Sequence, residues 1–186
     1  MNEVDFSALR HLRLPKVGQL GFVVRNIEQS LPYYSSIFNI NTWYQPNYKR
    51  KIYWSDTDEF GPEINFVLAF SGKVQIELVE TSFQKQNIFT EHIDKFGEGL
   101  HHLAFYVKNF DELVAGFKQL NIELLVTGEL NTAAGGEVRI AYFDTYEQCG
   151  TIFEVLEVKF FGLILPQTRF FMNIARLSGD VSMIKG

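Results

Sequence analysis

An internal repeat constrains the fold of this chain more than any other feature of its sequence. Residues 19–28, QLGFVVRNIE, align with residues 102–111, HLAFYVKNFD, and four of the ten aligned positions are identical. Repetition of a segment indicates a duplicated structural unit, because each copy specifies the same local structure. We therefore expect the chain to contain two copies of one module.

Each copy is predicted to begin with a strand that leads into a helix. Apolar residues alternate along both strands, as on a strand with one buried face. Asn26 and Asn109 follow the strands as favoured N-cap residues, and Gln29 and Glu112 stand where a capping box has its second partner. Because Pro32 removes a backbone hydrogen bond inside the first helix, we expect a kink or a later start there.

The rest of each copy is typical of strands. NFVLAF and KVQIELVE follow the first helix, EVRIAYF and TIFEVLE follow the second, and QIELVE (75–80) aligns with IFEVLE (152–157). These patterns predict an α+β fold of two βαβββ modules that form a paired, cupped mixed sheet with the helices outside.

The modules are predicted to span residues 16–81 and 98–159, with residues 82–97 as the linker. Residues 160–186 form a tail in which apolar residues recur at the spacing of an amphipathic helix: Phe170, Phe171, Ile174 and Leu177. We expect this apolar face to pack either on the body of the same chain or on a second subunit. A homodimer is therefore one of two open arrangements.

Charge and hydropathy exclude several classes of function. The formal net charge is −5, and Lys49–Lys51 is the basic run of the sequence, so a nucleic-acid partner is not expected. The first residues lack the basic and apolar segments of a secretory signal, and no apolar stretch is long enough to span a membrane. We expect a cytoplasmic protein that acts on a small molecule.

Four polar residues occupy positions that the repeat relates to one another. Gln19 aligns with His102, and Glu77 aligns with Glu154, so a two-fold relation between the modules would bring all four together. Glu154 shares its strand face with apolar residues, and a buried carboxylate is costly unless it is paired or bound to a metal. Glu77 alone would suit a half-exposed strand, but its recurrence in both copies favours a ligand.

Structural roles are the alternative for the other two residues. Gln19 and His102 are flanked by apolar residues and would also suit a hydrogen-bonded core amide and core histidine. Strand alternation predicts that His101 points to the face opposite His102 and is structural. His92, in the linker, is predicted to lie at the surface.

The candidate ligands define the kind of metal. A single cysteine, Cys149, excludes a zinc site with several cysteines, so the donors must be nitrogen and oxygen. One imidazole, one amide oxygen and two carboxylates suit a divalent ion such as Zn, Ni, Co, Mn or Mg.

These residues resemble the vicinal oxygen chelate superfamily, which includes glyoxalase I, methylmalonyl-CoA epimerase, extradiol dioxygenases and bleomycin-resistance proteins. The resemblance covers roughly residues 16–159. GEGLHHLAFYVKNFDEL (97–113) and KVQIELVE are similar to methylmalonyl-CoA epimerase. Gln19 stands where those epimerases usually carry histidine, and the set Gln, Glu, His and Glu resembles that of glyoxalase I.

The resemblance implies a metal-dependent enzyme. Gln19, Glu77, His102 and Glu154 would bind the divalent ion, which would chelate substrate oxygens and stabilise an enolate. Glu154 would be the catalytic base, with Glu77 as a ligand or as the base on the opposite face. The expected function is an isomerase or epimerase that abstracts a proton α to a carbonyl of an acyl-CoA-like substrate. Two alternatives stay open: lactoylglutathione lyase acting on a glutathione adduct, and a non-catalytic binding protein.

Overall fold

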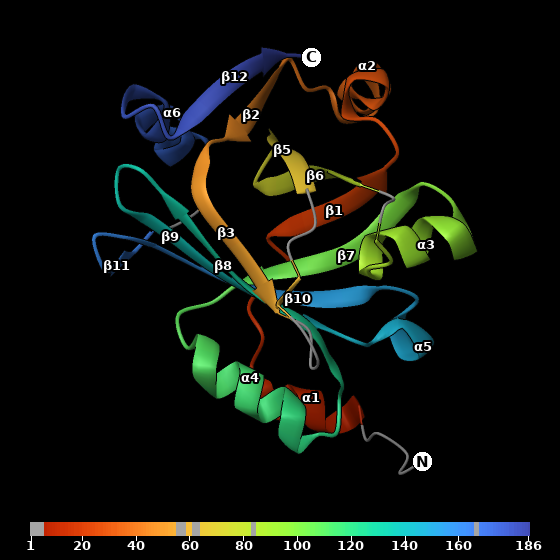
Figure 1. Cartoon of the computed structure of the whole chain (residues 1–186). Coiled ribbons are helices and arrows are strands. Elements are labelled where there is room, and N and C mark those ends of the chain that lie inside the picture. The colour runs from red at the N-terminus through yellow and green to blue at the C-terminus, as the bar shows by residue number, and fades with distance from the viewer. Residues whose placement is uncertain (1–5, 55–58, 61–63, 83–84, 166–167) are drawn as a thin grey trace.

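The structure is a computed structural model that describes residues 6–54, 59–60, 64–82, 85–165 and 168–186. It confirms the α+β class: one strongly curled mixed sheet carries helices on its outside (Figure 1). The first copy of the repeat forms β1 (Gln19–Val24), α2 (Ile27–Phe38), β2 (Thr42–Pro46), β5 (Ile64–Ser71) and β6 (Val74–Thr81). The second copy forms β7 (Gly99–Tyr106), α4 (Phe110–Gln119), β8 (Leu124–Thr132), β9 (Gly136–Phe143) and β10 (Ile152–Phe160).

Further elements surround the two copies. They are the 3-10 helix η1 (Phe6–Ala8), α1 (Leu9–Leu12), β3 (Tyr48–Trp54), β4 (Glu59–Phe60), α3 (Ile88–Phe96), α5 (Tyr146–Cys149), β11 (Leu163–Ile164), α6 (Arg169–Leu177) and β12 (Val181–Lys185). The strand order is β12-β2-β5-β6-β1-β7-β10-β9-β8-β3-β4, with β11 paired to β10. Within the described ranges, no helix is long and apolar enough to cross a membrane.

The two copies meet at the centre of the sheet. There β1 and β7 pair antiparallel, β1 pairs in parallel with β6, and β7 pairs in parallel with β10. The first and last strands of both copies are therefore neighbours, and a pseudo-two-fold axis passes between β1 and β7. This is the relation that the repeat predicts.

Of the two predicted N-cap residues, Asn26 caps its helix and Asn109 does not. Asn26 caps α2, because its Oδ1 accepts a hydrogen bond from the Gln29 backbone N–H at 2.8 Å. The helix begins directly after this residue and contains Pro32, so of the two expected effects of this proline the later start is wrong, and the kink stays a prediction. Asn109 precedes α4 but its side chain makes no capping bond; its Nδ2 donates to Glu112 Oε2 at 3.2 Å.

An arm formed by β2 and β3 connects the outer edges of the two copies. β2 ends at Pro46 beside β5, and β3 begins at Tyr48 and pairs with β8 at the far end of the second copy. This arm crosses the open side of the curled sheet (Figure 1). The basic run Lys49–Lys51 lies on β3, and the side chains of Arg50 and Lys51 are outside the described residues.

The tail contains strands as well as the predicted helix. β12 pairs with the β2 strand of the arm, and α6 packs beside it. Of the two arrangements expected for the apolar face of α6, packing on the body of the same chain is not observed for Phe170, Ile174 and Leu177, which are 68%, 43% and 80% exposed. Met172 is buried instead, and packing on a second subunit stays a prediction. The helix is anchored through Met172 because this residue belongs to the apolar cluster of Tyr44, Leu68, Phe70 and Val181.

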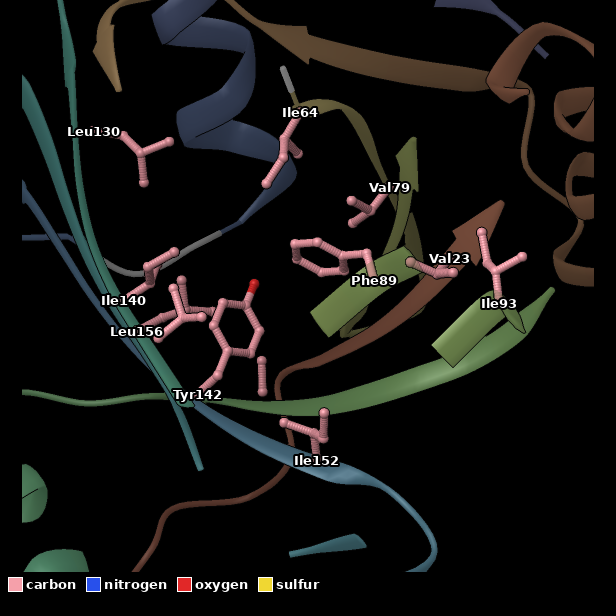
Figure 2. Close-up of a cluster of buried hydrophobic side chains, with 12 residues drawn as sticks. Val23, Ile64, Val79, Phe89, Ile93, Leu130, Ile140, Tyr142, Ile152 and Leu156 are labelled. Atoms are coloured by element: carbon pink, nitrogen blue, oxygen red, sulfur yellow. The ribbon is translucent and has the colours of Figure 1, made fainter. Parts of the chain in front are cut away.

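The interior of the curled sheet is a core shared by both copies. Figure 2 shows Val23 and Val79 of the first copy and Ile140 and Leu156 of the second pointing into this interior, with Phe89 of α3 between them. Separate apolar clusters lie under α2 and under α4 on the outside of the sheet. The polar residues predicted to bind metal therefore stand in an apolar setting.

Candidate metal centre

Strand pairing places Glu77 and His102 on either side of Gly21. Gly21 of β1 is opposite Glu77 of β6 and opposite His102 of β7. A Cβ atom at position 21 would lie 1.9 Å from the His102 ring, so the ring occupies the space that a glycine leaves. The absence of a side chain at this position allows the imidazole to lie across β1 towards β6.

The pseudo-two-fold repeats this arrangement with the other two residues. Ala104 of β7 aligns with Gly21 in the repeat, and it is opposite Gln19 of β1 and Glu154 of β10. Each small residue thus separates two of the four predicted ligands. The sheet brings all four to its concave side.

Three of the four residues are in direct reach of one another. His102 Nε2 lies 3.1 Å from Glu77 Oε2 and 3.2 Å from Glu154 Oε2. One donor atom from each of the three lies within 4.8 Å of the others, and all three residues are buried. One imidazole and two carboxylates in this arrangement are able to hold a divalent cation.

Gln19 is buried at the edge of this group and lines the same cavity as Glu77 and Glu154. Its Nε2 donates to Gln75 Oε1 at 2.8 Å, and the Tyr106 hydroxyl donates to the same oxygen at 2.5 Å. The amide orientation leaves Gln19 Oε1 as an available acceptor. Sequence reasoning did not select Gln75, although it stands two residues before Glu77 and therefore shares its strand face.

The donor atoms suit a cation. Gln19 Oε1 and Glu154 Oε2 are buried and accept no hydrogen bond from the described residues; the ion-pair contact of Glu154 Oε2 is with His102 Nε2, at 3.2 Å. A buried acceptor without a donor is costly, and a divalent ion satisfies such oxygens directly. The cavity that these residues line has a volume of about 60 Å³, which suits a small polar group. The residues therefore fit the metal that their chemistry implies.

Burial and mutual charge change the pKa values at this centre. Burial raises the pKa of Glu154 to about 8; neighbouring His102 opposes the shift and Glu77 adds to it. Burial lowers the pKa of His102, but the carboxylates of Glu154 and Glu77 outweigh this effect, so the pKa of His102 is raised. Without a metal, the centre therefore holds protons more tightly than isolated side chains do.

A β-bulge places His101 beside His102, so the predicted opposite orientation is wrong. Gly21 is opposite His102 but Phe22 is opposite Leu100, which makes His101 the extra residue of β7. His101 Nδ1 lies 2.9 Å from His102 Nδ1. The predicted surface position of His92 is also wrong: this residue is buried on α3, with its ring 5.1 Å from that of His101.

The hydrogen bonds of His101 determine the tautomer of His102. His101 Nε2 lies 3.3 Å from the carbonyl oxygen of Ile88, which only accepts, so this nitrogen carries the proton. Burial lowers the pKa of His101 well below its usual value, so its ring is neutral and Nδ1 accepts. His102 Nδ1–H therefore donates to His101. When His102 is neutral, its Nε2 lone pair faces the carboxylates, as a metal ligand requires.

Comparison with known proteins identifies the family. The profile of the Glyoxalase/Bleomycin resistance protein/Dioxygenase superfamily matches residues 18–142, more than half of the chain. The chain belongs to this superfamily. It is 23% identical over 146 residues to the uncharacterized protein YqjC of Bacillus subtilis (strain 168), covering 77% of this chain and 93% of YqjC.

Solved structures share the fold at low identity. Methylmalonyl-CoA epimerase from Mycobacterium tuberculosis is similar with a TM-score of 0.53 and 16% identity, covering 77% of this chain and 87% of that one. A Streptomyces coelicolor methylmalonyl-CoA epimerase in complex with 2-nitronate-propionyl-CoA is similar with a TM-score of 0.52 and 16% identity, covering 82% and 99%. At this identity, the similarity establishes the fold.

Replacing Gly21 tests the geometry of the centre. The Cβ of Gly21→Ala would overlap the His102 ring, so the buried imidazole must move. We expect the free energy of unfolding to fall by about 1–3 kcal/mol, as for other overpacked cores, measured by urea denaturation. Gly72→Asn is the control, because position 72 has open space and a φ of 62° that asparagine tolerates. Equal unfolding midpoints for Gly21→Ala and the wild type would contradict this geometry.

The pKa of Glu154 predicts how stability depends on pH in metal-free protein. The folded state holds this proton up to about pH 8, whereas an unperturbed carboxyl releases it near 4.5. The folded state therefore binds more protons than the unfolded state between these values, and the free energy of unfolding falls as pH rises across them. The raised pKa of His102 acts in the same direction.

The variant Glu154→Gln removes the contribution of Glu154, the larger of the two, to the pH dependence of the free energy of unfolding. With a chelator present, we expect urea denaturation at successive pH values to show a shallower decline for this variant than for the wild type. Parallel plots of unfolding free energy against pH for the two proteins would show that the pKa of Glu154 is not raised in the folded state.

Proposed function

We propose that this protein is a metal-dependent isomerase of the epimerase type, which abstracts a proton α to a carbonyl group. The observation that carries the proposal is the pair of buried carboxylates, Glu77 and Glu154, which both lie close to His102 Nε2 and line the same cavity. Such a pair suits proton removal and return, and the imidazole and amide supply further metal donors.

The proposed metal ligands are Gln19 through Oε1, His102 through Nε2, and the carboxylates of Glu77 and Glu154. When bound, a divalent ion such as Zn, Ni, Co, Mn or Mg supplies Lewis acidity that polarises a substrate carbonyl and stabilises an enolate. His101 orients the His102 ring by accepting its Nδ1 proton at 2.9 Å. The apolar residues around the cavity exclude water from the reacting carbon.

Glu154 is proposed as the base. In the metal-free protein, burial raises the pKa of Glu154 to about 8, so the apolar surroundings favour the protonated form that a base produces. Glu154 comes from β10 and Glu77 from β6, so the carboxylates approach from opposite sides of the β1–β7 pair. Epimerisation removes a proton from one face of a carbon and returns one to the other, and this placement suits that exchange.

Acyl-CoA thioesters are the proposed substrate class. Their thioester carbonyl acidifies the α proton, and methylmalonyl-CoA epimerases share this fold. One observation favours a second candidate, lactoylglutathione lyase: the donor set of Gln19, Glu77, His102 and Glu154 resembles that of glyoxalase I. The hemithioacetal of methylglyoxal and glutathione is therefore the second substrate to assay. A non-catalytic protein would bind these compounds without turnover.

Exchange of the α proton with deuterated water tests the proposal. Metal-loaded protein is incubated with methylmalonyl-CoA and with larger 2-substituted acyl-CoA thioesters, and NMR follows loss of the α-proton signal. We expect exchange with at least one thioester, and a rate about 10²- to 10⁴-fold lower in Glu154→Gln because the proton acceptor is lost.

Glu157→Gln is the matched control, because Glu157 lies on the same strand but pairs with Lys159 instead of His102. This variant should keep the exchange rate of the wild type. Lack of exchange with every thioester, or an unchanged rate in Glu154→Gln, would contradict the proposal.

A further inference from the structure

A second cavity adjoins the metal centre. Its volume is about 150 Å³, and it shares four lining residues with the smaller cavity above the candidate ligands: Tyr48, Leu68, Val138 and Val158. Tyr48 is the first residue of β3, where the arm between the two copies begins to cross the sheet. The two cavities are therefore neighbours, with these four residues between them.

The C-terminal tail builds the outer wall of this second cavity. Its apolar lining residues from the tail are Leu165, Phe171, Met172, Ile174, Ala175 and Val181. All of them lie beyond residues 18–142, the part of the chain that the superfamily profile matches. Asp180 fixes the tail against the second copy, because its carboxylate accepts hydrogen bonds from Thr132 Oγ1 at 2.7 Å and from the Ala134 backbone N–H at 3.1 Å.

Charge at the second cavity favours an apolar occupant. Asp180 is already bonded to Thr132 and Ala134, and Lys159 Nζ lies 2.5 Å from Glu157 Oε2. Glu137 is exposed at the rim. The remaining wall is predominantly aliphatic and aromatic, so it suits a hydrocarbon group better than a phosphate or a carboxylate.

The volumes of the two cavities limit the class of ligand that they are able to bind. An apolar cavity of about 150 Å³ is large enough to bind benzene, whereas the 60 Å³ cavity at the centre suits a small oxygen-bearing group. We propose that the substrate has two parts: oxygens that reach the metal centre, and an apolar arm the size of a phenyl ring or short branched chain that fills the second cavity. The assignment of the oxygens rests on the proposed function, whereas the assignment of the arm rests on the cavity.

Paired hydroxamates test this inference. Acetohydroxamate and benzohydroxamate both chelate a metal through two oxygens, but the second also carries a phenyl ring. Isothermal titration of zinc-loaded protein should show benzohydroxamate binding about tenfold or more tightly than acetohydroxamate, since burial of the ring in an apolar cavity is favourable. The ratio of the two affinities is the quantity of interest.

Ala175→Phe fills the second cavity from α6. In this variant the affinity ratio should fall at least fivefold while acetohydroxamate binding stays unchanged. Leu177→Phe is the matched control, because Leu177 is on the same helix, is 80% exposed and does not line the cavity. It should keep the wild-type ratio. An equal ratio in Ala175→Phe and the wild type would overturn the inference.

An experiment on metal-free protein distinguishes a wrong assignment of the apolar cavity from a wrong assignment of the metal centre. If neither hydroxamate binds, the metal assignment fails, and benzene is then added to the metal-free protein while NMR follows the methyl signal of Met172. A shift of this signal that disappears in Ala175→Phe supports the apolar site. An unperturbed Met172 signal at saturating benzene would overturn it, and this result on the wild-type protein decides the case even if Ala175→Phe does not fold.

Discussion

The antiparallel pairing of β1 with β7 is the constraint on which the rest of this structure depends. It joins the two copies of the repeat and puts Gly21 and Ala104 at equivalent positions beside the pseudo-two-fold axis. Because both residues are small, side chains from the neighbouring positions are able to meet over the strands. A larger residue at position 21 would displace His102, which connects Glu77 to Glu154.

The repeat predicted this centre because duplication preserves register as well as sequence. Alignment of Gln19 with His102 and of Glu77 with Glu154 was sufficient to predict that the four residues gather on one side of the sheet. Local patterns failed where tertiary structure overrode them. A bulge turned His101 onto the face of His102, and packing of α3 buried His92, and neither effect leaves a periodic signal in the sequence.

The parts outside the repeat were less predictable for a related reason. β3 is stabilised by pairing with β8, about 80 residues further along the chain, and such long-range contacts have no local signature. Helix α6 showed its apolar periodicity clearly, yet the face that it buries is set by where β12 places it against β2. The second cavity arises from these two additions, which explains why sequence patterns indicated a metal centre but not the shape of the space beside it.

The buried charges of the candidate centre favour a bound cation. Two carboxylates and an imidazole are buried together, the pKa of Glu154 is raised to about 8, and an amide oxygen and a carboxylate oxygen make no hydrogen bond among the described residues. A protonated centre satisfies this arrangement only in part, whereas a divalent cation neutralises the carboxylates and uses the remaining oxygens. We therefore expect one metal ion to be bound by all four residues.

Calorimetric titration of the metal-free protein with zinc, nickel, cobalt, manganese and magnesium tests whether these four residues bind a metal. We expect one ion per chain for at least one of these metals, with binding weakened at least tenfold in each of the folded variants Gln19→Ala, Glu77→Ala, His102→Ala and Glu154→Ala. Failure of every metal to bind, or affinities in the four variants equal to that of the wild type, would contradict this expectation.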